Sequence, residues 1–172
     1  MGEQEHRELA DKAGLTVRCG VIVVSDTRTL ENDTSGKAAF EILTKFGHQV
    51  IDLRLVRNDR KAVQEAVEEI LKAGADFVMT TGGTGVSKKD LSVEALRPLI
   101  EKELPGFGEL FRALSFREIG SAVIHSRALL GATSDGRLLA ALPGSEAAVR
   151  LALGEILVNE LKHLLWELRR HP

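Results

Sequence analysis

The sequence predicts an α/β domain: a three-layer, doubly wound, mostly parallel sheet with an appended β-hairpin and a long C-terminal helix. Three observations support this fold class. Strand-like apolar runs and amphipathic helical stretches alternate three times in the first 101 residues, the pattern of parallel strands joined by helices. The first apolar run shows no alternation, which is typical of a strand covered on both faces. A polar or glycine-rich loop follows each strand.

The first strand is expected at residues 17–24, where the run is continuous and largely β-branched. The polar stretch 25–34 breaks this pattern. Apolar side chains at helical spacing then predict a helix over 35–46, and Gly47 stands at its C′ position. The only cysteine, Cys19, lies inside the predicted strand, so we interpret it as a buried packing residue.

A second unit follows directly, with a strand over 49–56 and a helix over 60–73 that ends at Gly74. Asp59 precedes this helix and is well placed to cap it. A third unit has a short strand over 76–80 and a glycine-rich loop over 81–90. Its helix is expected to start at Ser92 as N-cap and to end near Glu101. Because parallel strands end at the same edge, the loops after all three strands should share one rim.

The rest of the chain predicts a helix over 109–116 and a hairpin of strands 128–132 and 138–142 that turns at Asp135-Gly136. Leucines at steps of three and four residues from 153 to 168 predict one long terminal helix that begins after Ser145. We divide the chain into an N-terminal extension over 1–15, expected to be helical, and a single domain over 16–172.

Composition excludes several classes of function. The 23 Lys and Arg residues nearly balance 25 Asp and Glu residues, so no strongly basic surface for nucleic acid is expected. There is no tyrosine, and one cysteine allows no disulfide framework. The first 14 residues are charged and contain no apolar core of a signal peptide or membrane helix. We therefore expect a cytoplasmic protein that binds neither nucleic acid nor membrane.

The loop Thr81-Gly82-Gly83-Thr84-Gly85 is the strongest functional signal. Three glycines in four positions let backbone amides approach an anion without an intervening side chain. The loop matches neither a P-loop, which needs a Gly-Lys-Ser/Thr ending, nor a dinucleotide fingerprint, which needs a third glycine where Lys88 stands. The alternative is a tight turn, for which one glycine suffices. We interpret this loop as a binding site for phosphate or another oxyanion.

Two carboxylates are candidate ligands for a divalent cation at the same rim. Asp90 follows Lys88 and Lys89, whose charges could offset those of a phosphate. Asp59 follows the second strand. Each has a purely structural alternative: Asp90 could belong to a solvated turn, and Asp59 could serve only as a helix cap.

Two further rim segments contain hydroxyls and carboxylates. Ser25-Asp26 and the run Asp33-Thr34-Ser35-Gly36 border the first loop, and Pro143-Gly144-Ser145 leads from the last strand into the terminal helix. Side chains of this kind bind polar ligands at helix N-termini. Loop structure alone also explains the segments at the first loop, and helix capping is the favoured explanation for Ser145.

In combination, these segments resemble the MogA/MoaB family of molybdenum-cofactor biosynthesis proteins. The resemblance covers residue 16 to the end of the chain, and the order and spacing of its motifs agree. The motifs are Val23-Val24-Ser25-Asp26, Asp33-Thr34-Ser35-Gly36, the glycine-rich loop with Asp90, Pro105-Gly106-Phe107-Gly108-Glu109 and Leu142-Pro143-Gly144-Ser145. Residues 111–116 and Ser126-Arg127 favour the MoaB branch.

The resemblance implies a trimer, or a hexamer of paired trimers, that binds molybdopterin. It implies an adenylyltransferase reaction in which the terminal phosphate of molybdopterin attacks the α-phosphorus of Mg-ATP and releases pyrophosphate. The product would serve a downstream molybdenum insertase. Asp59 and Asp90 match the two acidic positions that organise Mg²⁺ and the reacting phosphates. The substrate-binding positions that it implies are Ser25, Asp33, Ser35, Gly36, Thr81, Gly82, Gly83, Thr84, Gly85, Lys89, Glu109, Arg127, Pro143, Gly144 and Ser145.

One position departs from the pattern, because Lys88-Lys89 stand where the MogA branch commonly has two arginines. Lysines keep the charge and lose the bidentate grip on phosphate. Two alternatives stay open. The chain could be a molybdopterin carrier that does not catalyse adenylylation, or it could resemble the metal-insertase and nucleotide-hydrolysing competence-damage domains of the same fold. The sequence leaves open whether molybdenum or tungsten is the eventual metal.

Overall fold

The computed structural model describes residues 8 and 14–170. The strands are β1 (Arg18–Val24), β2 (Gln49–Val56), β3 (Phe77–Thr81), β4 (Lys102–Glu103), β5 (Leu129–Ala132) and β6 (Leu138–Leu142). The α-helices are α2 (Ser35–Lys45), α3 (Arg60–Lys72), α4 (Ser92–Leu96), α5 (Pro105–Ile119), α6 (Glu146–Val149) and α7 (Leu161–Arg169). The segments η1 (Arg97–Leu99) and η2 (Gly120–His125) are 3₁₀-helices, and η3 (Arg150–Leu157) is π-helical.

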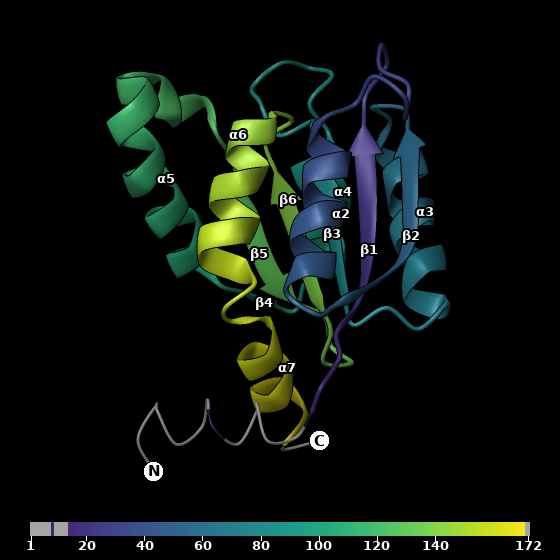
Figure 1. Ribbon diagram of the computed structural model, residues 1–172. Helices are drawn as coiled ribbons and strands as arrows, with labels where there is room; N and C mark the ends of the chain where they lie inside the picture. Colours follow the sequence, from purple (N-terminus) through teal and green to yellow (C-terminus); the bar gives the residue numbers. More distant parts are fainter. Residues whose placement is uncertain (1–7, 9–13, 171–172) are drawn as a thin grey trace.

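The six strands form one sheet in the order β2-β1-β3-β6-β5-β4. β1 pairs in parallel with β2 and β3, and β3 pairs in parallel with β6. β5 runs antiparallel to both β6 and β4. Helices cover both faces of this sheet (Figure 1). The predicted three-layer, mostly parallel α/β fold is confirmed.

Two hydrophobic clusters fill the space on the two sides of the sheet. Phe77 and Met79 of β3 belong to the cluster under α2, α5, η3 and α7, whereas Val78 belongs to the cluster under α3 and α4. Because β3 buries alternate side chains on opposite faces, all five of its positions are apolar or fully covered. This explains why the strand sequences show no polar alternation.

Most predicted elements have the expected position, and the region after the glycine-rich loop needs correction. Ser92 is the first residue of α4 and does not cap it; Leu91 is the N-cap residue and makes no side-chain cap bond. The predicted helix to residue 101 ends at Leu96, because Pro98 has no N–H to continue it. The helix predicted from Glu109 begins at Pro105, a residue favoured in the first helical turn.

The predicted long terminal helix is interrupted. It begins with α6, widens into the π-helical η3, turns at residues 158–160 and resumes as α7. The Val158 N–H donates to the Leu153 carbonyl at 2.9 Å, five residues back. Gly154 in η3 and Asn159 in the turn are weak helix formers, which favours the break. The leucine spacing does not reveal it, because an i→i+5 turn shifts the buried face by only one residue.

The hairpin is confirmed, with β6 inside the sheet between β3 and β5 and the unpredicted β4 at the edge. Thr133 N–H donates to the Arg137 carbonyl at 2.9 Å across the turn, where Gly136 has a φ of 76°. The predicted helical extension over 1–15 lies largely outside the described residues.

Candidate functional site

The carboxyl ends of β1, β2, β3 and β6 lie at one edge of the sheet, and their loops are bonded to each other. The Ser25 N–H donates to the Val56 carbonyl at 3.0 Å, and the Gly82 N–H donates to the Leu142 carbonyl at 2.9 Å. The Asn58 N–H donates to Asp26 Oδ1 at 3.0 Å. The prediction of one shared rim is confirmed, and β6 contributes a fourth loop to it.

Glycine is required at the start of the loop after β3 because the backbone there is left-handed and crowded. Gly82 has a φ of 102° and Gly83 a φ of 69°. A Cβ atom on Gly82 would overlap the Val24 carbonyl oxygen, and one on Gly144 would lie 3.0 Å from Gly82 Cα. The Ser92 hydroxyl donates to the Gly82 carbonyl at 2.7 Å and holds the turn from the other side. The loop therefore begins in one rigid conformation.

Beyond this turn, the loop presents a row of unused backbone donors. In the part of the chain that the structure describes, no acceptor is bonded to the N–H groups of Gly83, Thr84, Gly85 or Val86. Thr84 is buried, so its N–H is shielded from bulk solvent. Consecutive amide donors of this kind form a concave site for an anion. The geometry agrees with the interpretation of the loop as an oxyanion site.

The loop closes at Asp90, which is half-buried. Asp90 Oδ2 accepts a 2.9 Å hydrogen bond from the Ser87 N–H, and the Asp90 N–H donates to the Ser87 carbonyl at 3.0 Å. These bonds fold residues 87–90 into a tight turn whose outer surface carries the exposed Lys88 and Lys89. Asp90 Oδ1 makes no further bond in the described residues, so one carboxylate oxygen is available to a ligand.

Asp59 is the N-cap of α3, as predicted: Oδ1 accepts from the Ala62 N–H at 2.8 Å. The side chain is exposed. The neighbouring Asn58 uses its Oδ1 to accept from the Leu91 N–H at 3.3 Å. Because Asp59 and Asp90 adjoin two residues joined by a hydrogen bond, both carboxylates belong to the same small region of the rim.

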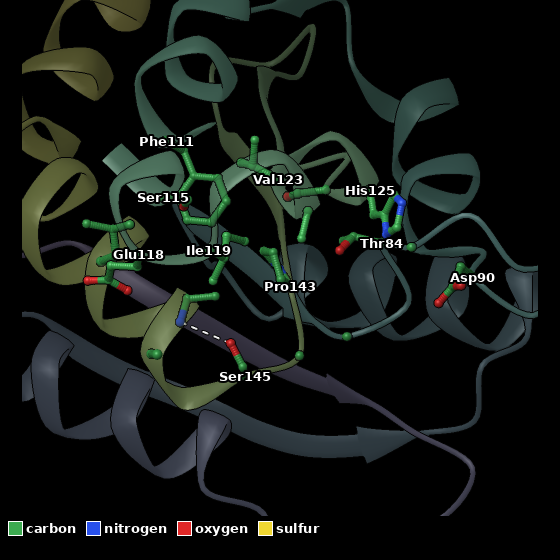
Figure 2. A pocket seen from close by; sticks show the side chains of 18 of the residues that line it. Thr84, Asp90, Phe111, Ser115, Glu118, Ile119, Val123, His125, Pro143 and Ser145 are labelled. Carbon is green, nitrogen blue, oxygen red and sulfur yellow. Dashed lines mark hydrogen bonds between the residues drawn. The ribbon is translucent and has the colours of Figure 1, made fainter. Parts of the chain in front are cut away.

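A cleft of about 380 Å³ lies against the glycine-rich loop (Figure 2). Eight of the residues implied by the family resemblance line it: Gly82, Gly83, Thr84, Gly85, Asp90, Pro143, Gly144 and Ser145. Ser145 is also the N-cap of α6, as expected, and its Oγ accepts from the Ala148 N–H at 3.1 Å. Figure 2 shows Asp90 at one end of the cleft and Glu118 at the other.

The opposite wall was not foreseen from the sequence. Phe111, Ser115 and Ile119 on one face of α5, Val123 and His125 of η2, and Leu151 of η3 line it. The spacing of 111, 115 and 119 does predict one helical face. That spacing alone does not distinguish a face that packs on the core from one that lines a cleft. The site thus combines a polar backbone cradle with an apolar wall.

Four predicted ligands in the loop after β1 use their polar atoms internally. Asp33 is buried: Oδ1 accepts from Ser35 Oγ at 2.8 Å and Oδ2 from the Gly36 N–H at 2.6 Å. Arg28 also contacts Asp33 Oδ1 at 3.2 Å and donates to the Gly144 carbonyl at 2.9 Å. Ser25 Oγ accepts from the N–H groups of residues 27 and 28. None of the four predicted ligands lines the cleft: Ser25, Asp33, Ser35 and Gly36.

The other predicted residues are also placed outside the cleft. The Thr81 hydroxyl donates to the Pro143 carbonyl at 3.1 Å and joins two rim loops. Lys89 is exposed on the loop, and Glu109 is exposed beside a separate small pocket under α5. Arg127 contacts the outer side of the glycine-rich loop. Their roles as substrate ligands stay predictions.

The rest of the molecule offers few other candidates. Over residues 8 and 14–170, no cluster of three or more His, Cys, Asp or Glu side chains is arranged for a metal ion. Burial, with a smaller contribution from Asp76, raises the pKa of the Cys19 thiol to about 12, so it is an unreactive packing residue as predicted. No helix in that range has the length and apolar character needed to cross a membrane.

Comparison with known proteins adds independent information. The model of a family described as a probable molybdopterin binding domain matches residues 20–163. Molybdenum cofactor biosynthesis protein B of Bacillus cereus is 42% identical over 172 residues, and the match covers 99% of each chain. A crystal structure of a molybdenum cofactor biosynthesis protein B is 42% identical, has a TM-score of 0.86 and covers 91% of this chain and 98% of that one. The tungsten cofactor synthesizing protein MoaB from Pyrococcus furiosus is 39% identical, has a TM-score of 0.83, and the match covers 90% and 98%.

Proposed function

This chain belongs to the molybdopterin-binding domain family of molybdenum-cofactor biosynthesis, on its MoaB branch, and we propose that it transfers an adenylyl group from Mg-ATP to molybdopterin. The observation that carries the proposal is the row of four unbonded N–H groups from Gly83 to Val86, which borders a cleft with an apolar wall. The amides can donate hydrogen bonds to a phosphate, and the apolar wall can pack against a flat ring system. Molybdopterin and ATP each contain a phosphate and a flat ring system.

The two rim carboxylates fit the chemistry of a magnesium ion. Mg²⁺ is usually held by one or two carboxylates together with substrate phosphates and water, so a cluster of three protein ligands is not needed. Asp90 and Asp59 each commit one oxygen to a backbone N–H. Their second oxygens make no bond in the described residues and would hold the ion. When bound, Mg²⁺ would neutralise charge on the phosphates of ATP.

The proposed reaction needs positioning more than a protein nucleophile. An oxygen of the terminal phosphate of molybdopterin bonds to the α-phosphorus of ATP, the bond from that phosphorus to the β-phosphate oxygen breaks, and pyrophosphate leaves. The amides of the loop bind and orient one phosphate, and Lys88 and Lys89 reduce repulsion between the two anions. Residues of α5 and Pro143-Gly144 line the cleft and would limit the positions that the two substrates can adopt.

The test compares the unmutated protein with Asp90→Asn in a mixture of molybdopterin, ATP and magnesium. Asparagine keeps an oxygen that can accept from the Ser87 N–H, and it replaces the charged second oxygen by an NH2 group that cannot hold a cation. We expect adenylylated molybdopterin and pyrophosphate from the unmutated protein, and a rate lower by about 10²–10³-fold in the variant with molybdopterin still bound, the size of effect seen when one electrostatic group is removed from an active site. Asp135→Asn, in the β5–β6 turn, is the control and should leave the rate unchanged.

Binding of molybdopterin without product in the unmutated protein would show that the chain is a carrier. Hydrolysis of a dinucleotide in a separate pyrophosphatase assay would instead favour the nucleotide-hydrolysing relatives of this fold.

We also propose that the protein works as a trimer or hexamer. Phe116 and Ile124 are large apolar side chains on α5 and η2 with 58% and 74% of their surface exposed, a pattern that favours contact with another protein surface. Light scattering of the purified protein distinguishes a monomer of 18.7 kDa from either assembly.

A further inference from the structure

Arg127 lies just before β5 and contacts the outer side of the glycine-rich loop. Its Nε donates to the carbonyl oxygens of Gly85 at 2.8 Å and Thr84 at 3.3 Å, and its Nη2 donates to the Asp90 carbonyl at 3.1 Å. Its own backbone N–H donates to the Thr84 carbonyl at 3.3 Å. One side chain therefore joins both ends of the segment 84–90.

Glu94 of α4 orients this guanidinium. Its Oε1 pairs with Nη1 and its Oε2 accepts from Nη2 at 3.2 Å, which is the bidentate arrangement of an arginine and a carboxylate. The hydrogen bond from Arg127 lowers the pKa of Glu94 below its usual value, so the carboxylate stays charged at neutral pH. With Glu94 and the loop carbonyls bonded, four of the five guanidinium N–H groups have acceptors, and Arg127 has little capacity left for a substrate.

We propose that Arg127, oriented by Glu94, is a positioning residue that sets the glycine-rich loop in its anion-binding form. The inference rests on the proposed function, since it concerns the same loop. It assigns to Arg127 a role through the loop backbone and not through contact with molybdopterin or ATP.

Peptide geometry gives the mechanism. In a trans peptide the N–H points opposite to the carbonyl. Because Arg127 holds the carbonyls of Thr84 and Gly85, the N–H groups of Gly85 and Val86 point away from it. Thr84 and Gly85 line the cleft, whereas Arg127 and Glu94 do not and line a separate pocket. The amides are thus directed to the side on which the anion binds.

The pair acts by geometry more than by charge. Arg127 and Glu94 together are neutral, so they add little net field at the cleft, and both side chains are about one-third exposed, which weakens an ion pair. A lysine would supply the same charge as Arg127 without the planar fork that reaches three carbonyls and a carboxylate. A variant with lysine at position 127 therefore tests whether the geometry of Arg127 matters or only its charge.

The experiment uses Arg127→Ala, Arg127→Lys and Glu94→Gln, with Arg97→Ala as control. Arg97 pairs with Glu103 at 2.8 Å in the same pocket and makes no hydrogen bond or ion pair with the described residues of the loop. Because its charge also acts on Glu94, its variant controls for the loss of a neighbouring positive charge. Trypsin cleavage after Lys88 and Lys89, followed by mass spectrometry, reports opening of the loop in the folded protein without any substrate.

We expect cleavage at these lysines to be faster by about ten-fold in Arg127→Ala, faster to a smaller extent in Arg127→Lys and Glu94→Gln, and unchanged in Arg97→Ala. In the adenylylation assay, kcat should decrease across the series as the cleavage rate increases. Guanidinium ion at about 20 mM should restore part of the rate to Arg127→Ala only, because it can occupy the vacated position.

A cleavage rate in Arg127→Ala equal to that of the unmutated protein would overturn the inference, because the loop would then not depend on Arg127. A rise in KM for one substrate with the loop still closed would also overturn it, because Arg127 would then act as a substrate ligand. Absence of adenylylation in the unmutated protein would overturn the proposed function alone. The cleavage series would still decide whether Arg127 positions the loop.

Discussion

The loops after β1 and β3 lie side by side at the same rim and use their polar groups in opposite ways. In the loop after β1, Asp33 is buried and both of its oxygens accept bonds from within the loop and from α2. In the loop after β3, four consecutive N–H groups from Gly83 to Val86 have no partner in the described chain. The polar groups of the first loop are bonded within the protein, and the second loop is open to a ligand.

This difference shows that polar residues at a rim do not identify a binding site by themselves. What distinguishes a ligand site is unused hydrogen-bonding capacity next to a cleft. By this criterion the loop after β3 is the binding element, and the loop after β1 supports it through Arg28, which also bonds to Gly144.

The largest expected effect tests the loop after β1. Asp33→Ala should lower the free energy of unfolding by about 3 kcal/mol, because it leaves the hydroxyl of Ser35, the N–H of Gly36 and the Arg28 guanidinium without a buried acceptor. Urea denaturation measures this. Asp26→Ala in the same loop removes one exposed acceptor and should cost less than about 1 kcal/mol. A stable Asp33→Ala protein with weakened substrate binding would reverse the assignment of the two loops.

Gly85→Ala tests the loop after β3. A Cβ atom at this position would lie 2.7 Å from Asp90 Oδ2, so the methyl group would displace the carboxylate. We expect adenylylation to be slower by about ten-fold or more, as when a catalytic group is moved from its productive position, with unfolding changed by less than about 1 kcal/mol. Gly106→Ala is the matched control, because no atom lies within 4 Å of its added Cβ. Equal rates in the two variants would contradict the proposed cradle.

Ser25→Ala and Ser145→Ala compare two hydroxyls that each accept backbone N–H bonds. Both should destabilise the protein by about 1 kcal/mol, the usual cost of losing a cap. Only Ser145 lines the cleft, so only its variant should also raise KM, by a few-fold. Thermal denaturation and steady-state kinetics on both proteins provide the comparison, and a raised KM in Ser25→Ala would show that the first loop contacts substrate after all.

The smallest expected effect is a pH dependence of protein stability that comes from the Glu94–Arg127 pair beside the loop after β3. The pKa of Glu94 is lowered in the folded protein from its usual value of 4.5. The stabilisation of the folded protein by ionised Glu94 is therefore present above about pH 4.5, and it is lost as the pH falls through the pKa of Glu94 in the folded state. Because the Glu94–Arg127 pair is partly exposed, the free energy of unfolding of the unmutated protein should exceed that of Glu94→Gln by at most about 0.5 kcal/mol at pH 6. This difference should disappear in acid, and a difference that grew in acid would contradict the assignment.

The fold was predictable because its signals are local. Apolar runs, helical spacing and the glycines at 47 and 74 define strands and helices within a few residues of themselves. The errors fell where a local signal was ambiguous. The helix predicted from Glu109 begins at Pro105, and the leucine spacing after Ser145 does not show the π-helical segment.

The site was predictable only in part. Residues 82–85, Asp90 and the segment 143–145, which the family resemblance names, line the cleft, whereas the α5 wall with Phe111 and Ile119 is not predicted from the sequence. A helix face that lines a cleft and one that packs on a core have the same periodicity. The two kinds of helix face differ in how deeply their side chains are buried and in which residues pack against them. Both properties depend on the fold of the whole chain.

The sequence by itself determined the α/β class, the shared rim and the choice of the glycine-rich loop as the candidate anion site, because each of these follows from residue types close together in the chain. Only the tertiary structure decided which polar groups are free. Asp33 and Asp90 are both acidic rim residues, yet the first has its oxygens bonded and the second retains one that is open. Hydrogen bonds between segments far apart in sequence, such as those from Arg127 to the loop, make that selection.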